Sequence, residues 1–368
     1  MEDERYIDCS ATKTTICRIM SEPLYLDHAA TTPLLPAARE AMAAGFALWA
    51  NPSSPHRLGR AARAALETAR ERVVAALGWT GELVFTSGAS EAIGMALGRS
   101  VQPLAAVSSV EHEAVLRLAV DTPRLAVDGC GLVTVPQALP AGLVAVQQVN
   151  NETGVIQSLD AIAATVRSAG GLLLADCAQS AGKLALPDAD LIAISAHKFG
   201  GPIGSGALLV RDWAMLRPSG GQERGYRPGT ENLPGAMAMA AALEAGQDWL
   251  VEAARLRALL ESALRESGGT VIAEDAPRLA TIGAYRMPGV SAAAQLIRFD
   301  GMGIAVSAGS ACSSGSLRTS HVLAAMGIED RAAAEVVRVS IGRETSEGDI
   351  LRFIAAWREI AGCGRAAA

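Results

Sequence analysis

The sequence predicts an α/β fold in which a mostly parallel sheet is flanked by helices and followed by a smaller α+β unit. Short apolar runs lack the alternation of half-exposed strands, so we expect strands that are buried on both faces. Ala-rich stretches with helical spacing separate these runs, which is the pattern of parallel strands joined by helical crossovers. After about residue 235 the pattern changes to long helices rich in Ala, Leu, Glu and Arg around a few strands.

The elements of the first unit follow each other regularly. The expected strands are 82–85, 104–110, 143–149, 171–175, 190–195 and 206–210. Helices are expected over 37–49, 58–77 and 159–170, and from about 91 and 111. Gly170 suits the end of one of them, because glycine favours the left-handed conformation found there. In the second unit we expect helices over 235–267, 320–326 and 347–361.

Composition excludes several classes of function. The 368 residues carry a net charge of −6 with both signs scattered, which argues against a nucleic-acid or membrane-surface protein. No apolar run is long enough for a transmembrane helix. The six cysteines form no C-x-x-C pair, so we expect neither a metal site nor a disulfide scaffold. The first 19 residues lack the apolar core of a signal peptide, and we expect a cytoplasmic protein.

Groups with catalytic chemistry follow the expected strands. Ligands of open α/β sheets bind at the carboxyl ends of the strands. The turn TSGASE (86–91) leads into a helix whose N–H groups can hold a phosphate. Glu111–His112, Asn150–Asn151, Asp176 and His197–Lys198 follow the next strands. Each feature alone is more often structural, but their convergence on one rim indicates a site.

This combination is what pyridoxal phosphate needs. A lysine forms a Schiff base with that cofactor, and an aspartate keeps the pyridinium nitrogen protonated so that the ring can take up electrons. One crossover and one strand separate Asp176 from Lys198, so the two residues can lie at neighbouring strand ends.

Ten short motifs carry a family resemblance in order over residues 25–342. They are YLDHAATTP (25–33), NPSSPHRLGR (51–60), FTSGASEA (85–92), EHEAV (111–115), VNNETG (149–154), DCAQSAGK (176–183), SAHKFGGPIGSG (195–206), GGQERGYRPGTEN (220–232), GSACSSG (309–315) and VRVSIG (337–342). Together they resemble the cysteine desulfurases of the class V aminotransferase family, which have PLP fold type I. GSACSSG separates desulfurases from aminotransferases of the same fold.

The resemblance implies roles around the cofactor. Lys198 would be the Schiff-base lysine and would move the substrate protons, while His112 would stack on the ring and could help in proton transfer. Asp176 would pair with the ring nitrogen and Gln179 with the ring hydroxyl. The phosphate would be held by Ala89, Ser90, Ser195, His197 and, from a partner subunit, Thr230.

The resemblance also implies a nucleophile and a substrate clamp. Arg338 would bind the substrate carboxylate in a two-pronged pair, with Asn151 beside it and beside the cofactor. Cys312 would attack the sulfur of L-cysteine as a thiolate, which would leave a persulfide on Cys312 and release alanine. Cys177, inside a cofactor motif, is expected to be a small core residue and not a second nucleophile.

The domain and partner expectations follow from the same resemblance. We expect residues 1–19 to be a disordered extension, 34–244 a large PLP-binding domain, and 20–33 with 245–368 a small domain that carries the cysteine loop. The expected partners are a second copy of the chain and a sulfur acceptor for iron–sulfur cluster assembly or tRNA thiolation. Cys312 would touch metal only in transient contact with a partner's iron–sulfur cluster.

Other functions stay open at this point. A selenocysteine lyase, a cysteine sulfinate desulfinase or an aminotransferase could use the same fold. A non-catalytic sulfur-relay or scaffold protein is a reading of a different class, but Lys198, Asp176, His112 and Arg338 argue against a retired enzyme.

Overall fold

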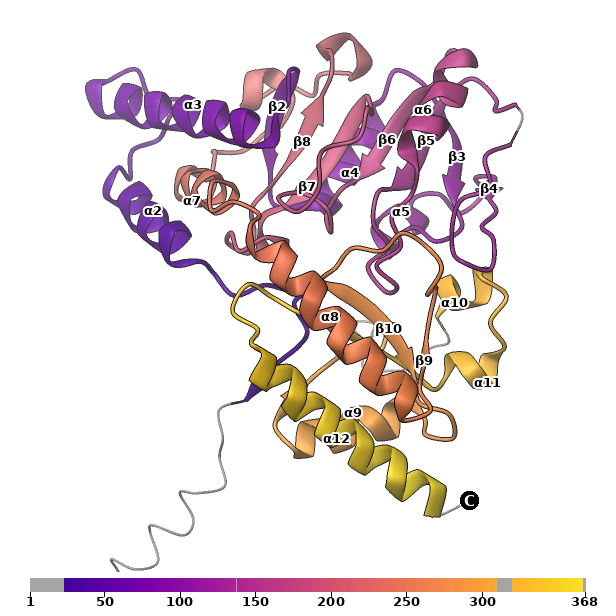
Figure 1. The fold of residues 1–368 in the computed structure, drawn as a ribbon. Coiled ribbons are helices and arrows are strands. Elements are labelled where there is room, and N and C mark those ends of the chain that lie inside the picture. Colours follow the sequence, from indigo (N-terminus) through magenta and orange to yellow (C-terminus); the bar gives the residue numbers. More distant parts are fainter. Residues whose placement is uncertain (1–22, 137, 310–319, 367–368) are drawn as a thin grey trace, which may run out of the picture.

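The computed structural model describes residues 23–136, 138–309 and 320–366, and its larger part is built on a seven-stranded sheet (Figure 1). The strands are β2 (Glu82–Thr86), β3 (Leu104–Ser108), β4 (Arg124–Leu125), β5 (Leu143–Gln147), β6 (Leu172–Asp176), β7 (Leu191–Ser195) and β8 (Gly206–Val210). Their order is β2-β8-β7-β6-β5-β3-β4. Only β8 runs against its neighbours, so the prediction of a mostly parallel sheet is confirmed.

Helices cover both faces of this sheet. One face packs on α3 (Arg57–Leu77), α6 (Leu159–Ser168) and α7 (Leu233–Leu243) through residues such as Leu66, Ile162 and Met239. The other face packs on α4 (Ala89–Arg99) and the short α5 (Glu113–Leu116) through residues such as Ile93. Successive residues of one strand therefore enter different cores, which is why the strand sequences do not alternate.

A second hydrophobic core lies around shorter strands. The three-stranded antiparallel sheet has the order β12 (Val336–Ser340), β10 (Ile282–Arg286), β9 (Thr270–Val271). Its helices are α8 (Trp249–Glu266), α9 (Ala292–Gly301), α10 (His321–Ala325), α11 (Asp330–Ala333) and α12 (Glu347–Ala366). Phe299, Phe353 and Trp357 form an aromatic centre in this core.

The N-terminal segment joins the two cores. Strand β1 (Leu24–Tyr25) pairs in parallel with β11 (Ile304–Ala305), and Leu24 and Leu26 are buried in the second core. The chain then crosses to the large sheet, where Thr32 N donates to His197 O and Leu35 N to Gly200 O. Helix α2 (Pro36–Ala47) follows and packs on α7. This crossing places residues 27–32 against the edge of the large sheet that carries Lys198.

One expected helix is wrong as stated. The stretch 235–267 forms two helices, α7 and α8, and not one. Gly246 has φ +78° between them, a left-handed conformation that ends regular helix. The expectation for residues 1–19 falls outside the described residues. The domain boundaries at 33/34 and 244/245 stay a prediction, which the two separate cores support.

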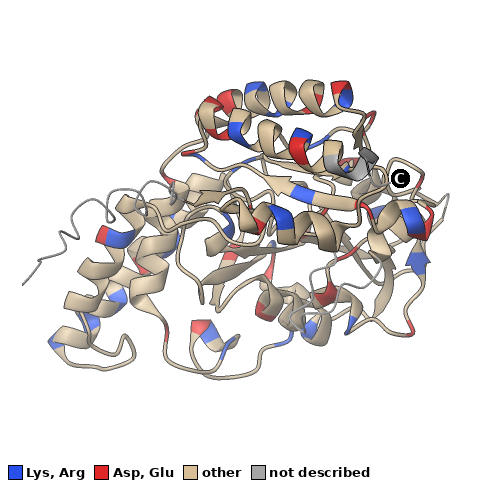
Figure 2. Ribbon diagram, turned by 90° about the horizontal axis from the view of Figure 1, so that it is seen from below, with Lys and Arg blue, Asp and Glu red and all other residues tan. Residues whose placement is uncertain are grey.

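The surface carries mixed charge. Figure 2 shows Lys and Arg interspersed with Asp and Glu along the helices. No helix in the described part of the chain has the length and apolarity needed to cross a membrane.

Candidate active site

Most of the predicted site residues come together at one rim of the large sheet. Strands β2, β3, β5, β6 and β7 point the same way, so their carboxyl ends meet at this rim. At the ends of these strands lie the N-terminus of α4, His112, Asn151, Asp176 and the 3-10 turn Ala196–Lys198.

Asp176 is a buried carboxylate at the end of β6. Its Oδ1 accepts a hydrogen bond of 2.9 Å from Ala178 N, and within the described ranges it has no ion-pair partner. Burial raises its pKa, while nearby His112 and Lys198 oppose that rise. A cationic group placed against Asp176 would therefore be strongly favoured, since a buried charge needs a counter-charge.

His112 is open to solvent at the rim, although protein surrounds much of the ring. Its Nδ1 accepts a hydrogen bond of 3.1 Å from Ala114 N at the start of α5, so the proton of the neutral ring is on Nε2. Desolvation lowers the pKa of His112. The imidazole is thus neutral at pH 7 and available to stack on a flat ligand.

Gln179 has an unused acceptor in the rim. Its Nε2 donates to Ala29 O at 2.9 Å, which fixes the amide. Its Oε1 is buried and has no hydrogen-bond partner among the described residues. An unpaired buried acceptor is costly, so this oxygen calls for a donor from a ligand.

Lys198 extends from the turn after β7 towards the crossing N-terminal segment. Its Nζ donates to Ala29 O at 2.7 Å and to Ala30 O at 2.8 Å. Burial, and then the charge of Arg338, lower the pKa of Lys198 to about 8, against the opposing pull of Asp176 and Asp27. A sizeable fraction of this amine is therefore neutral and nucleophilic near neutral pH.

A small cradle lies where α4 begins. Gly88 has φ +153°, and a Cβ there would lie 3.4 Å from Ser195 Oγ. A Cβ on Gly206 would lie 2.5 Å from Gly88 Cα, so only glycine allows this close approach. The first turn of α4 contains Ala89 and Ser90, whose N–H groups precede the first intrahelical bond.

His197 lies in the turn after β7, two residues beyond Ser195. Its Nδ1 lies 3.2 Å from Thr31 Oγ1, and burial lowers its pKa to about 4. The ring is thus neutral and acts as a hydrogen-bonding group, not as a charge.

Arg338 reaches the rim from β12 in the second core. Its Nη1 donates to Asn151 O at 3.0 Å and its Nη2 to Asp27 Oδ1 at 2.8 Å. Its Nε is buried without a partner in the described chain. The guanidinium is fixed in position and still has donors for an incoming carboxylate.

Two predicted residues are not brought into this cluster. Thr230 is exposed, and its hydroxyl forms no hydrogen bond within the described part of the chain. Cys312 lies outside the described residues. Gly309 and Ser320 are the described residues that flank that segment, and both lie against Glu152. Glu152 Oε2 accepts a hydrogen bond of 2.5 Å from Ser320 Oγ, and a Cβ on Gly309 would collide with the same oxygen.

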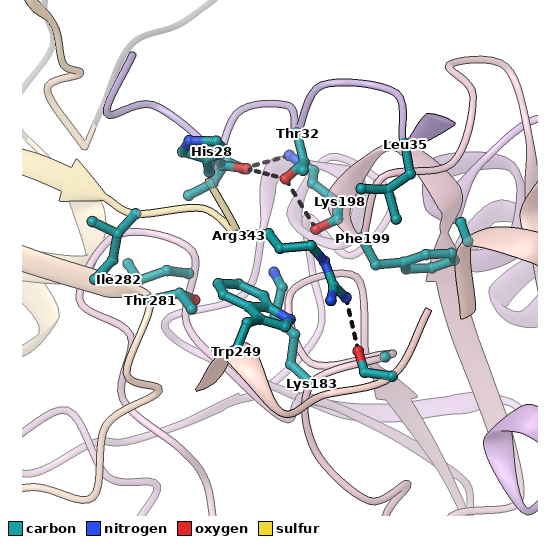
Figure 3. Close-up of a pocket in the computed structure, with 15 residues that line it drawn as sticks. His28, Thr32, Leu35, Lys183, Lys198, Phe199, Trp249, Thr281, Ile282 and Arg343 are labelled. Carbon is teal, nitrogen blue, oxygen red and sulfur yellow. Dashed lines mark hydrogen bonds between the residues drawn. The ribbon is translucent and has the colours of Figure 1, made fainter. Parts of the chain in front are cut away.

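A cavity opens behind Lys198 (Figure 3). Its lining includes Lys183, Trp249 and Arg343, and the Arg343 guanidinium lies over the Trp249 ring at 5.4 Å. Complete burial and the charge of Lys198 lower the pKa of Lys183 to about 7. Lys183 is therefore a second amine near the rim that is partly neutral at neutral pH.

The sequence did not reveal the residues that hold Lys198 and Arg338 in position. Asp27, Ala29 and Ala30 lie in the motif YLDHAATTP, whose individual residues received no roles. The acidic side chain and two backbone carbonyls of this motif hold Arg338 and Lys198. A strand-like segment near the N-terminus with a charged residue before two alanines was the available signal.

Comparisons with known proteins agree with this geometry. The family model described as aminotransferase class-V matches residues 24–353. The chain is similar to a cysteine desulfurase of Bradyrhizobium diazoefficiens, at 36% identity covering 92% of this chain and 94% of that protein. It is 36% identical to an IscS-like cysteine desulfurase of Mycobacterium tuberculosis, covering 89% and 93% of the two chains.

Solved structures give the same picture. A NifS-like protein from Rickettsia africae superposes with a TM-score of 0.84 at 28% identity, covering 92% of this chain and 99% of that one. A structure described as SspA in complex with cysteine has a TM-score of 0.75 at 28% identity, covering 86% and 98%.

Proposed function

We propose roles for the rim residues in the reaction of this chain. The chain belongs to the class-V aminotransferase family and is an enzyme, a cysteine desulfurase. The observation that carries the proposal is the convergence on one rim of a low-pKa lysine, a buried unpaired carboxylate and a buried amide oxygen that lacks a donor. Each of these three groups matches a different part of pyridoxal phosphate.

The described residues fit that cofactor. Asp176 supplies the buried negative charge that a protonated ring nitrogen needs, and Gln179 Oε1 supplies the free acceptor for a ring hydroxyl. The cradle at Gly88–Ser90, with Ser195 and His197, offers N–H groups and hydroxyls to a phosphate. When bound, pyridoxal phosphate withdraws electrons from the bonds to the substrate's α-carbon.

Lys198 would hold the cofactor and then act as a base. Because its pKa is lowered to about 8, the Nζ atom can release its own proton and accept one from a carbon acid near neutral pH. His112 would cover one face of the ring as a neutral imidazole. Arg338, with Asn151 beside it, would orient the substrate carboxylate through its remaining donors.

Cys312 would receive the sulfur. Its thiolate attacks the substrate sulfur, so that a new S–S bond forms as the bond between sulfur and the β-carbon breaks. The electron pair of the broken bond stays with the carbon fragment, which takes up protons and leaves as alanine. The sulfur remains on Cys312 as a persulfide for transfer to an acceptor.

A homodimer would complete the phosphate site with Thr230. Support comes from exposed apolar side chains near the segment that carries Thr230. Phe46 and Trp49, at 62% and 80% exposure, lie in and just after α2, and Gly45 of that helix packs directly against Pro234. Large exposed apolar groups of this kind mark contact surfaces.

The substrate is L-cysteine, and the alternatives that act on selenocysteine or cysteine sulfinate are not favoured, because the similar curated proteins are named cysteine desulfurases. An iron–sulfur scaffold or a tRNA-thiolation carrier in the cytoplasm would then be the acceptor.

Product analysis of the purified holoenzyme tests this function. We expect alanine from L-cysteine, cofactor released by alkali in a one-to-one ratio with chains, and neither in Lys198→Ala. Asp188→Asn, a change on an exposed ion pair, is the matched control. Alanine from cysteine sulfinate or selenocysteine but not from L-cysteine would contradict the proposal.

A further inference from the structure

Residues 219–231, here called the arm, contain a strained turn. Glu223 and Arg224 have φ of 48° and 55°, and Gly225 follows with φ 89°. Two consecutive non-glycine residues in the left-handed region are unfavourable, and such strain persists only where surrounding contacts enforce it. The contacts that enforce the strained turn indicate the role of the arm.

One anchor joins the arm to the edge of the large sheet. Glu223 is 2% exposed, and its carboxylate accepts from Arg70 Nη1 at 2.8 Å and from Arg70 Nη2 at 2.9 Å. The same carboxylate accepts from Phe85 N at 2.8 Å, and Arg70 Nη1 also donates to Leu83 O at 2.7 Å. The buried pair thus satisfies the free edge of β2 and fixes the arm to it.

A second anchor joins the arm to the phosphate cradle. Arg227 Nε donates to Glu91 Oε1 at 2.8 Å, and Glu91 Oε2 accepts from Ser87 N at 2.5 Å. Glu91 lies in the first turn of α4, directly after Ala89 and Ser90. The cradle and the arm are therefore connected through one carboxylate.

Thr230 lies between fixed points. On one side is Arg227, and on the other Glu231, which accepts from Arg63 Nη1 at 3.0 Å. Pro228, Gly229 and Thr230 between them are exposed. The arm therefore presents Thr230 outwards on a rigid support.

We infer that the Arg227–Glu91 ion pair is a positioning device that serves two cofactor sites. It holds the arm that offers Thr230 to the phosphate site of a second copy. Through Glu91 it also contacts the phosphate cradle of its own chain. The inference rests on the proposed dimer and on the proposed role of Thr230. Preorganising Thr230 lowers the entropic cost of closing the other copy's site, so loss of the pair in one copy should weaken cofactor binding in the other.

Mixed dimers test this directly. One copy carries Lys198→Ala, which silences its own cofactor site, together with Arg227→Gln, and the other copy is wild type. We expect pyridoxal phosphate to dissociate roughly two- to fivefold faster from the wild-type site than in a dimer whose silenced copy has a normal arm. Arg227→Lys, which retains the charge, should restore most of the loss. Arg72→Gln, which removes an exposed ion pair to Glu244, is the control.

The outcomes separate the inference from its premises. Unchanged dissociation of pyridoxal phosphate from the wild-type site would overturn the inference. The premises are tested by light scattering for the dimer and by Thr230→Ala in the silenced copy. If Thr230→Ala has no effect on the wild-type site, then the proposed role of Thr230 fails, whatever Arg227→Gln does.

Discussion

Asp27 and Arg338, 311 positions apart in the chain, form an ion pair of 2.8 Å at the rim of the active site. The pair exists because the N-terminal segment lies beside β12, where Asp27 bridges to Ser340. Asp27 holds the guanidinium in place, but its carboxylate would also compete with a substrate carboxylate for Arg338. In the proposed role of Arg338, its remaining donors would therefore bind the substrate carboxylate in the presence of this internal anion.

Replacing Asp27 by Asn should strengthen substrate binding. The amide oxygen can still accept from Arg338, while the competing negative charge is removed. We expect the KM for L-cysteine to fall roughly two- to fivefold, the size expected of a partly exposed charge pair. Steady-state kinetics measure it, with Asp188→Asn as the control. A rise in KM at unchanged stability would mean that Asp27 mainly positions Arg338.

Amine labelling should detect the low pKa of Lys198. The chain has only three lysines, Lys13, Lys183 and Lys198, so each can be followed by peptide mass spectrometry. In cofactor-free protein, acetic anhydride should label Lys198 with a midpoint near pH 8, because its pKa is lowered to about 8. Arg338→Gln should raise that midpoint, since Arg338 helps to lower the pKa. A Lys198 midpoint above pH 10 would contradict the description of the rim.

Glu111 should make the protein less stable as pH rises. It is fully buried, its Oε1 accepts from Ser108 Oγ and Gln147 N, and burial raises its pKa to about 8. Between about pH 4.5 and 8 the unfolded chain loses this proton while the folded chain keeps it, so the free energy of unfolding falls by up to about 1.4 kcal/mol per pH unit.

The variant Glu111→Gln should remove that dependence. Denaturant unfolding at pH 5, 6, 7 and 8 should therefore show a stability advantage of the variant that grows with pH. A difference that stays constant over this range would show that Glu111 is ionised in the folded protein.

Cys177 should be chemically inert. It is 0% exposed, and burial raises the pKa of its thiol above the usual range. Since the thiolate is the reactive form, iodoacetamide should leave Cys177 unlabelled in the folded protein. Cys177→Ala should keep desulfuration within about twofold, because it removes one small buried group. A loss as large as that of Cys312→Ala would make Cys177 a participant.

Much of the rim could be predicted because it depends on local pattern. A buried strand followed by Asp176, or by Ser195 and Lys198, indicates a strand end, and parallel strands end at the same edge. The contacts made by Asp27, Ala29 and Ala30 could not be predicted in this way. They depend on β1 joining β11 far along the chain, a pairing of two residues per strand that has no periodicity to detect.

The arm shows a different limit. The motif GGQERGYRPGTEN contains enough glycine to predict a turn, but the left-handed residues are Glu223 and Arg224. Their strain is offset by a buried ion pair with Arg70, on a helix about 150 residues earlier. Long-range enforcement of a locally unfavourable conformation leaves no local signature. The break at Gly246 was detectable in principle, but the Ala-rich flanks favoured a continuous helix.

The most direct measurement is mass spectrometry of the protein after brief incubation with L-cysteine, beside Cys312→Ala. The proposed function predicts about 32 Da, one sulfur atom, added to the Cys312 peptide as a persulfide, with alanine released and neither product in the variant. Alanine formed without that adduct, or formed equally by Cys312→Ala, would contradict the central claim that Cys312 takes the sulfur.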